Sequence, residues 1–332
     1  MHKMVQFMLI ASASLVSLMS HAETYVTNVA ELKVAVENDV ANGGEPSGGT
    51  IILAEGVYGA SNNIKMALLT NKSMTFRPET DLNTGQLAEV TLEGYIQITG
   101  DDMFDKTVTY QGLILKAAAS GMFTGSPNLA RLNIVENTIT GGAFYFGFSN
   151  FANLNELVMV GNNITYTSEV ILYANNAIHF HGNRVQSNNG SYVRLHTNTT
   201  NGVSNVSGNE FKGGGTSGTA VKSGQAVSVT SGDKTFVVGN RFDITSVDSM
   251  IYLAGMKETT IVNNLLTRTG NYNTNNQFIA LTGSGVVSHQ IQNNVFELKS
   301  FNPNTDLIKL VEHLGDDFAY FKNNLLIGFP TE

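Results

Sequence analysis

The sequence predicts an all-β fold, a single-stranded right-handed parallel β-helix (solenoid) with a short N-terminal capping helix. An asparagine that stands just ahead of apolar residues returns every 20 to 31 residues. The segments between its copies hold runs of four to six residues rich in Val, Ile, Phe and Thr, bounded by Gly, Asn and Ser. A unit that recurs at this length is typical of a solenoid and is too short for two helices. The copies are Asn137, Asn163, Asn183, Asn209, Asn240, Asn264, Asn294 and Asn324.

The repeated asparagine predicts a repeated bend in each coil. Asparagine tolerates the left-handed backbone conformation, and its side-chain amide can stack on the copy in the next coil. Repeats built from helices need periods of about 33 to 47 residues and apolar residues spaced along one helical face. The sequence shows neither pattern, so we expect coils of β-strands.

The region after residue 22 predicts a closed end and the first coil. Asn28 can cap a helix over Val29 to Val40, which would cover the strand edges that a β-helix leaves open. Gly48 to Leu53 is the first expected strand, and Ala54 to Tyr58 is an expected turn. No equivalent cap is evident before Glu332. Further strands are expected at Ser73–Phe76, Glu89–Leu92 and Tyr95–Ile98, followed by the asparagine-marked coils from Val108 to Phe329.

The first 22 residues have the pattern of a secretory signal peptide. Lys3 supplies a positive charge, Val5 to Met19 are mostly apolar, and Ser20 to Ala22 form a small-residue cleavage site. We therefore expect a secreted or periplasmic bacterial protein with one β-helical domain over residues 23–332. The apolar stretch is too short to cross a bilayer and no later stretch approaches 18 apolar residues, so no membrane span is expected.

The composition excludes several partners and chemistries. The chain has 19 basic and 27 acidic residues, a net charge of −8 and no basic runs, so no nucleic-acid partner is expected. It has no cysteine, which excludes disulfides and thiol chemistry. An acidic ligand is not excluded, because a local basic patch can lie on an acidic protein. The oligomeric state is left open.

Strand alternation predicts which side chains face outward in the middle of the chain. In the segment Tyr192 to His196, the two interposed apolar residues should point into the core, which turns Tyr192, Arg194 and His196 outward. Tyr173 faces outward one coil earlier, 21 residues before Arg194, where the two side chains could stack on strands roughly 4.8 Å apart. The expected outward stripe continues with Ser228, Tyr252 and Lys309.

Four segments carry motifs that occur together in one known family. Gly49 to Tyr58 is similar to an opening of the form G-D-T-I-x-L-x-x-G-x-Y. Glu169 to Tyr173 resembles an E-I-I-S-x-K coil, and Gly190 to His196 resembles the G-x-L-T-L-R-H-G coil that comes next. Gly208 to Phe211 matches the following G-N-x-F. Together these segments resemble the chondroitinase B and alginate lyase family, the β-helical polysaccharide lyases of family six.

The resemblance implies an activity and a set of site residues. In that family a Lys is the base, an Arg one coil later is the acid, and a calcium ion held by Asn and Glu side chains neutralises the substrate carboxylate. Arg194 matches the Arg if one residue is deleted from its strand, and the same deletion puts Tyr173 in the place of the Lys. Glu169 matches one calcium-binding Glu, whereas Thr167 stands where its acidic companion is found. Ca²⁺ at Glu169 is therefore the one cofactor that the resemblance implies.

The outward residues also suit β-elimination from a uronic acid. That reaction needs a cation at the sugar carboxylate, a base for the C5 proton and an acid for the leaving oxygen. Arg194 suits the carboxylate because its guanidinium forms a bidentate fork. His196 or a Tyr173 phenolate is the expected base, and Tyr173 or Tyr192 the expected acid. Tyr192, Tyr252 and Lys309 are expected to bind the sugars.

Two other chemistries fit the sequence less well. A glycosidase needs two facing carboxylates, and only Glu169 stands near the basic cluster. His179 and His181 alternate outward as a pair, which is more typical of a solvated strand face than of a zinc site. The sequence therefore predicts an exported polysaccharide lyase that cuts an acidic polysaccharide, such as alginate or a bacterial exopolysaccharide. The alternative is a non-catalytic β-helix that binds glycan or serves at a cell surface or in a biofilm matrix.

Overall fold

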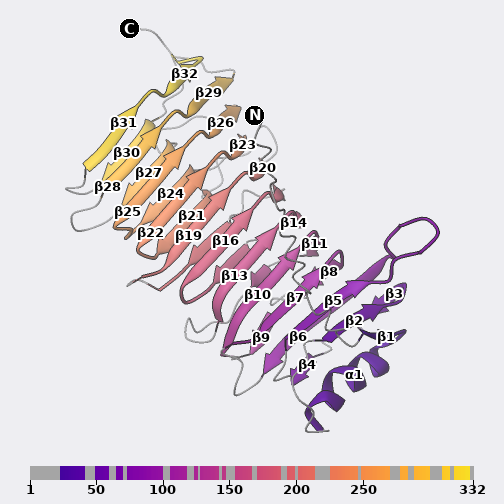
Figure 1. Ribbon diagram of the computed structural model, residues 1–332. Coiled ribbons are helices and arrows are strands. Elements are labelled where there is room, and N and C mark those ends of the chain that lie inside the picture. The colour runs from indigo at the N-terminus through magenta and orange to yellow at the C-terminus, as the bar shows by residue number, and fades with distance from the viewer. Residues whose placement is uncertain are drawn as a thin grey trace, which may run out of the picture.

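The chain folds into a parallel β-helix, as a computed structural model shows (Figure 1). Every pairing between its named strands is parallel, and three long sheets run along the helix axis. The predicted signal peptide, Met1 to Ala22, lies outside the residues that the structure describes. These are residues 23–41, 49–59, 65–69, 73–99, 105–117, 123–125, 128–141, 144–146, 154–166, 170–187, 193–198, 201–213, 225–245, 248–269, 277–282, 288–299, 309–314 and 318–329.

The first sheet has 12 strands and the second has 13. In spatial order the first contains β1 (Glu23–Val26), β2 (Gly49–Leu53), β5 (Met74–Pro78), β7 (Thr107–Gln111), β10 (Leu129–Val135), β13 (Leu154–Val160), β16 (Ala177–His181), β19 (Val203–Ser207), β22 (Lys234–Val238), β25 (Glu258–Val262), β28 (Ser288–Gln292) and β31 (Phe318–Lys322). The second contains β3 (Gly56–Tyr58), β6 (Val90–Thr99), β8 (Ile114–Ala117), β11 (Thr138–Gly141), β14 (Asn163–Tyr166), β17 (Arg184–Ser187), β20 (Glu210–Gly213), β23 (Arg241–Ile244), β26 (Leu265–Thr269), β29 (Val295–Lys299) and β32 (Leu325–Ile327), and β4 (Lys65–Leu69) and β9 (Phe123–Gly125) pair with β6.

The third sheet has seven strands and is confined to the later coils. It carries most of the residues that the sequence singles out. Its strands are β12 (Phe144–Phe146), β15 (Val170–Tyr173), β18 (Val193–His196), β21 (Gln225–Ser231), β24 (Ser249–Ala254), β27 (Gln277–Thr282) and β30 (Lys309–Leu314).

One helix, α1 (Val29–Ala41), lies at the N-terminal end of the solenoid (Figure 1). Asn28 caps it as predicted, because the Asn28 side-chain oxygen accepts a hydrogen bond from the Glu31 amide at 2.9 Å. Leu32 and Val36 are buried and join the apolar core, so the helix covers the end of the first coils. The predicted turn over Ala54 to Tyr58 is wrong in part, since its last three residues form β3.

The predicted asparagine ladder is confirmed as the internal spine of the solenoid. In each link, the backbone N–H and the side-chain Nδ2 of one asparagine both donate to Oδ1 of the next, at 2.8 to 3.2 Å. Each Nδ2 also donates to a backbone carbonyl of the preceding coil. All members except the last are buried. The ladder runs through Asn137, Asn162, Asn183, Asn209, Asn240, Asn264, Asn294 and Asn324.

Two details of the ladder differ from the sequence prediction. The second member of the ladder is Asn162 and not Asn163. Asn163 begins strand β14, and its side chain is exposed. The left-handed residue is not the ladder asparagine but the residue before it, as at Gly161 (φ 67°) and Asn263 (φ 59°). The left-handed residue turns the chain, and the asparagine after it keeps an ordinary backbone conformation. Its side-chain amide can then point toward the next coil.

A column of aromatic side chains fills the interior. Phe180, Phe211 and Phe242 stack on successive coils, with ring centroids 6.2 and 4.7 Å apart. Nearer the N-terminal end, Tyr110 stacks on Phe76 at 4.8 Å with nearly parallel rings. The hydroxyl of Tyr110 is buried and has no hydrogen-bond partner among the described residues. Burial raises the pKa of this phenol well above its usual value, so the group stays neutral.

Tyr110→Phe should therefore stabilise the protein by about 1 kcal/mol, because it removes a buried polar group that makes no hydrogen bond. The stacking on Phe76 is kept by the substitution. Urea unfolding at constant pH measures the change. A loss of stability on removing the hydroxyl would show that this group is hydrogen-bonded in solution.

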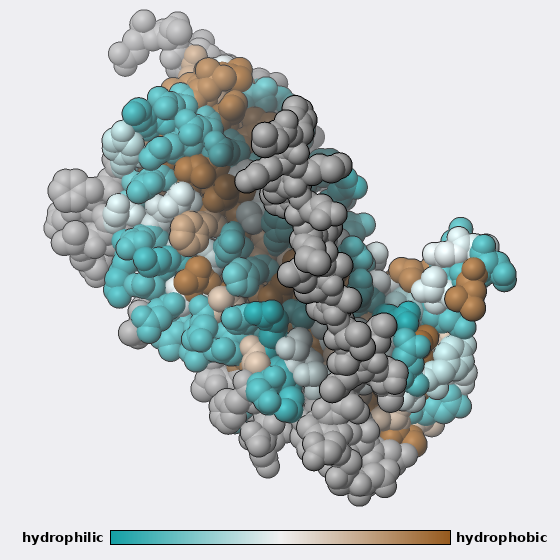
Figure 2. Space-filling view, in the orientation of Figure 1, coloured by the Kyte–Doolittle hydropathy of each residue, from teal (hydrophilic) through white to brown (hydrophobic). Residues whose placement is uncertain are grey.

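The opposite end of the solenoid presents apolar side chains. On the last described coil, Phe321 and Leu326 occupy positions that are inward in the preceding coils, yet they are 43% and 45% exposed. Apolar residues gather over this end in Figure 2.

Candidate functional site

The register of the third sheet aligns its outward side chains in two rows. The first row, called here the arginine row, runs Ile171, Arg194, Ser228, Tyr252, Ala280 and Glu312. The second row, the histidine row, begins with Tyr173 opposite His196. Successive strands of a sheet lie roughly 4.8 Å apart, so both rows run along the axis of the solenoid. A face of this kind suits a long, extended ligand.

The strand pattern that turns Arg194 and His196 outward is the predicted one. Val193 and Leu195 are fully buried in the core, whereas Arg194 and His196 between and after them are partly exposed. In β15, Val170 and Leu172 are likewise buried and Tyr173 is partly exposed. Because side chains alternate along a strand, the three functional candidates share the outer face of adjacent coils.

Tyr173 and His196 form an aromatic pair. Their ring centroids are 4.8 Å apart and the ring planes differ by 15°, so the phenol and the imidazole lie almost parallel. This pair corrects one prediction: Tyr173 lies directly opposite His196, and the residue opposite Arg194 is Ile171. The one-residue deletion that aligned both coils with the lyase motif changes which side chains face each other.

His196 is neutral at physiological pH in this environment. Partial burial, reinforced by the positive charge of Arg194, lowers the pKa of His196 from 6.5 to about 4. The Nδ1 atom of the imidazole lies 2.8 Å from the hydroxyl of Thr230 on the next coil. A neutral imidazole with one nitrogen bound in this way can exchange a proton through the other nitrogen.

Buried side chains alternate with partly exposed ones along the arginine row. Ile171, Ser228 and Ala280 are 6%, 1% and 1% exposed, although they occupy outward positions. Ile171 and Ala280 are not members of the apolar core cluster. Ser228 lies between Arg194 and Tyr252 in the register of the sheet, and both of these longer side chains are partly exposed. Ser228 lies where the sequence predicted, but it is not exposed.

The later end of the face differs from the predicted stripe. Tyr252 is in the arginine row as expected, and its hydroxyl accepts a hydrogen bond from Thr282 at 3.2 Å. Lys309 is not in that row, because it pairs with Gln277 and binds the Glu312 carboxylate at 2.6 Å. The row therefore ends on a carboxylate, and the binding role predicted for Lys309 stays a prediction.

Two predicted site residues, Tyr192 and Glu169, lie outside the described residues, as does Thr167. Among the residues that the structure does describe, no group of three or more His, Cys, Asp or Glu side chains could hold a metal ion. Calcium binding at Glu169 stays a prediction.

The histidine pair on β16 lies on the first sheet, away from the arginine row. His179 and His181 alternate outward as predicted, and His181 Nδ1 lies 2.9 Å from the Ser207 hydroxyl. A serine neighbour on the next coil fits a solvated strand face.

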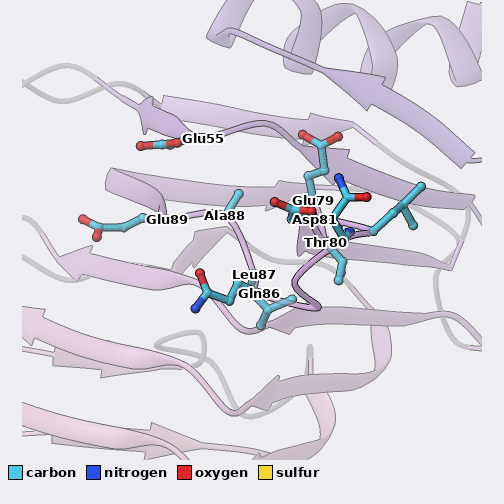
Figure 3. A pocket seen from close by; sticks show the side chains of 10 residues that line it. Glu55, Glu79, Thr80, Asp81, Gln86, Leu87, Ala88 and Glu89 are labelled. Carbon is cyan, nitrogen blue, oxygen red and sulfur yellow. Dashed lines mark hydrogen bonds between the residues drawn. The ribbon is translucent and has the colours of Figure 1, made fainter.

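A separate pocket of about 590 Å³ opens near the N-terminal end (Figure 3). It lies beside the loop between β5 and β6, in which Thr80 and Leu87 form an antiparallel bridge. Four carboxylates and no basic residue line it, so it would repel an acidic glycan. The carboxylates are Glu55, Glu79, Asp81 and Glu89.

The fold and the outer face of the third sheet define a class of protein. It is a parallel β-helix that carries a guanidinium, a neutral imidazole and phenols on that face. Comparison with protein-family models and with curated proteins gave no match. In the described part of the chain, no helix is long and apolar enough to span a membrane.

Sequence reasoning missed two polar groups that belong to the face, Thr230 and Glu312. Thr230 reaches His196 only because of an irregular strand pairing, and nothing in the local sequence marks that irregularity. Glu312 follows Lys309 on the same strand, and the unequal spacing of successive coils hid its register with Tyr252.

Proposed function

We propose that this protein is an exported polysaccharide lyase that binds an acidic, uronate-containing polysaccharide along the arginine row and cleaves it by β-elimination. The observation that carries the proposal is the meeting of Arg194, His196 and Tyr173 on the outer face of adjacent coils. The reaction requires a cation, a base and an acid, and a guanidinium, a neutral imidazole and a phenol can fill these three roles. Alginate or a bacterial exopolysaccharide fits this chemistry.

Arg194 would pair with the C6 carboxylate of the sugar. Its positive charge stabilises the negative charge that develops on that carboxylate when the C5 proton leaves. A planar guanidinium can hold the two carboxylate oxygens together, which also fixes the sugar ring relative to His196.

His196 would then accept the C5 proton. The electron pair of the C5–H bond forms the C4–C5 double bond, and the C4–O glycosidic bond breaks. Tyr173 would donate its phenolic proton to the leaving oxygen, and the two protein groups then return to their starting states by proton exchange. The stacked arrangement of Tyr173 and His196 supports this division, because it holds the two rings 4.8 Å apart, within reach of one sugar residue.

The first test is the ultraviolet absorbance of the unsaturated uronate, followed during incubation with alginate, polyguluronate, dermatan, pectate and exopolysaccharides, with and without calcium. We expect absorbance to rise with at least one of them. Because His196 must be neutral, kcat/KM should stay high down to an acid limb near pH 4. An acid limb near pH 6.5 would show that His196 is not the base. An acid limb that persists in His196→Gln would show the same.

A second candidate function is glycan binding without turnover, in a cell-surface or matrix protein. The observation that favours it is Tyr173 in the place of the lysine of the resembled family. A flat absorbance trace across the panel, with glycan retained by the immobilised protein, would replace the first proposal with this one.

A further inference from the structure

The pairing of β18 with β21 is irregular at His196. Val193 and Leu195 lie opposite Val227 and Val229, but His196 lies opposite Ser231, so the register shifts by one residue. Thr230 is the additional residue in β21. A β-bulge of this kind redirects a side chain next to the place where the extra residue is inserted. Here it brings the Thr230 hydroxyl to 2.8 Å from His196 Nδ1.

The bulge is anchored by the residue that follows His196. Thr197 is fully buried, and both its backbone N–H and its hydroxyl donate to the carbonyl oxygen of Ser231, at 3.3 and 3.1 Å. Two glycines surround Thr197 so closely that a Cβ at Gly202 or Gly232 would lie 2.4 or 2.6 Å from its hydroxyl oxygen. The irregular pairing is thus held from inside the solenoid, by contacts that do not involve the outer face.

We propose that Thr230 is a positioning residue that holds His196 in the Nδ1–H tautomer, with the Nδ1–H donating to the threonine hydroxyl. Nε2 is then the nitrogen that accepts a proton from the sugar. This inference rests on the proposed function, because it assigns to His196 the tautomer that a base needs. A threonine hydroxyl can donate or accept, so the direction of the bond follows from the role of the ring: with Nδ1 engaged by Thr230, Nε2 acts as the base only if the proton is on Nδ1.

The Thr230 hydroxyl has a second effect on the imidazole. Its bond at Nδ1 and the stack on Tyr173 together fix the orientation of the ring, one at its edge and one at its face. Removing the hydroxyl should therefore change both the tautomer and the ring orientation, without removing any group that touches substrate.

The test is ¹⁵N–¹H correlation spectroscopy of histidine side chains in the full chain, at pH 7. The chain has seven histidines, so His196→Gln is used to assign the signal of interest. We expect the wild-type His196 to give the Nδ1–H pattern, Thr230→Ser to keep it, and Thr230→Val to shift the ring toward the Nε2–H tautomer. Thr260→Val, on an outward position of the first sheet, is the matched control and should leave the signal unchanged.

Activity gives a second readout. With the lyase substrate, Thr230→Val should lower kcat about 10-fold and leave KM within about twofold, in the range seen when a partner that orients a histidine is removed. Thr230→Ser should restore most of the loss.

The two proposals fail in different ways. An Nε2–H pattern in the wild type, or a His196 signal that Thr230→Val leaves unchanged, overturns the positioning role whatever the activity. If the spectra are as expected but no unsaturated product forms, the Thr230 contact is retained and only the lyase function is overturned. Should Thr230→Val fail to fold, the wild-type and Thr230→Ser spectra still decide the tautomer.

Discussion

Asn162→Ala should lower the free energy of unfolding by about 3 to 5 kcal/mol, whereas Asn163→Ala should change it by less than about 0.5 kcal/mol. The two residues are neighbours of identical type, so composition and helix or strand propensity do not distinguish them. Only the ladder does. Asn162 is buried and makes ladder bonds to both flanking coils, and Asn163 exposes its side chain.

The large cost has an identifiable source in the groups left behind. Without the Asn162 side chain, the buried N–H of Asn137 loses its acceptor at 2.9 Å, and the carbonyl of Ile134 loses its donor at 2.8 Å. Each buried polar group left without a partner costs about 1 to 3 kcal/mol, and the substitution leaves two such groups between adjacent coils. No water reaches them unless the coils separate.

Chemical denaturation of both variants, with the transition followed by circular dichroism, measures the difference. Equal stability of the two variants would mean that the ladder does not hold the coils together. A large loss in Asn163→Ala alone would place the ladder on the residue that the repeat pattern first indicated.

The comparison of these two asparagines also shows what the sequence can and cannot predict. The repeat of Asn before apolar residues was enough to predict a β-helix, because few folds place one amide at every coil. In Gly161-Asn162-Asn163, however, either asparagine fits that pattern. The choice depends on which residue takes the left-handed conformation, here Gly161, and the sequence prediction assigned that conformation to the wrong position.

The candidate site was predictable as a face but not as a set of contacts. Alternation within β15 and β18 placed Tyr173, Arg194 and His196 outward, because the core residues Val170, Leu172, Val193 and Leu195 point inward. The register between coils was not predictable in this way. The connections that join the strands differ in length, and a shift of two residues decides whether Tyr173 faces Arg194 or His196.

The bulge at Thr230 is a stronger example, since it depends on Thr197 and Gly202, which are distant from it in the sequence, as well as on the nearby Gly232. Contacts of this kind arise only once the coils are stacked. They are also the contacts that tune the chemistry of His196.

Arg194→Ala should reduce kcat/KM for the polysaccharide by about 1,000-fold, because it removes the charge that stabilises the developing carboxylate. Arg194→Lys should recover part of this loss, since it keeps the charge but not the bidentate geometry. The fold should persist in both, because Arg194 lies on the outer face and the core residues on either side of it are unchanged. Initial rates from uronate absorbance, with circular dichroism as the folding control, measure both effects.

Arg194 leaves a second signature that does not depend on turnover. Its charge is the lesser of the two causes that lower the pKa of His196, after burial. In Arg194→Ala the pKa of His196 should therefore rise from about 4 toward its usual value without reaching it, while Arg194→Lys should leave it low. A titration of the histidine signals distinguishes these cases. If the pKa of His196 is the same in Arg194→Ala as in the wild type, the charge of Arg194 does not lower the pKa of His196, and burial alone accounts for the shift. If it rises while both variants keep full activity, the electrostatic coupling is real and the substrate lies elsewhere on the solenoid.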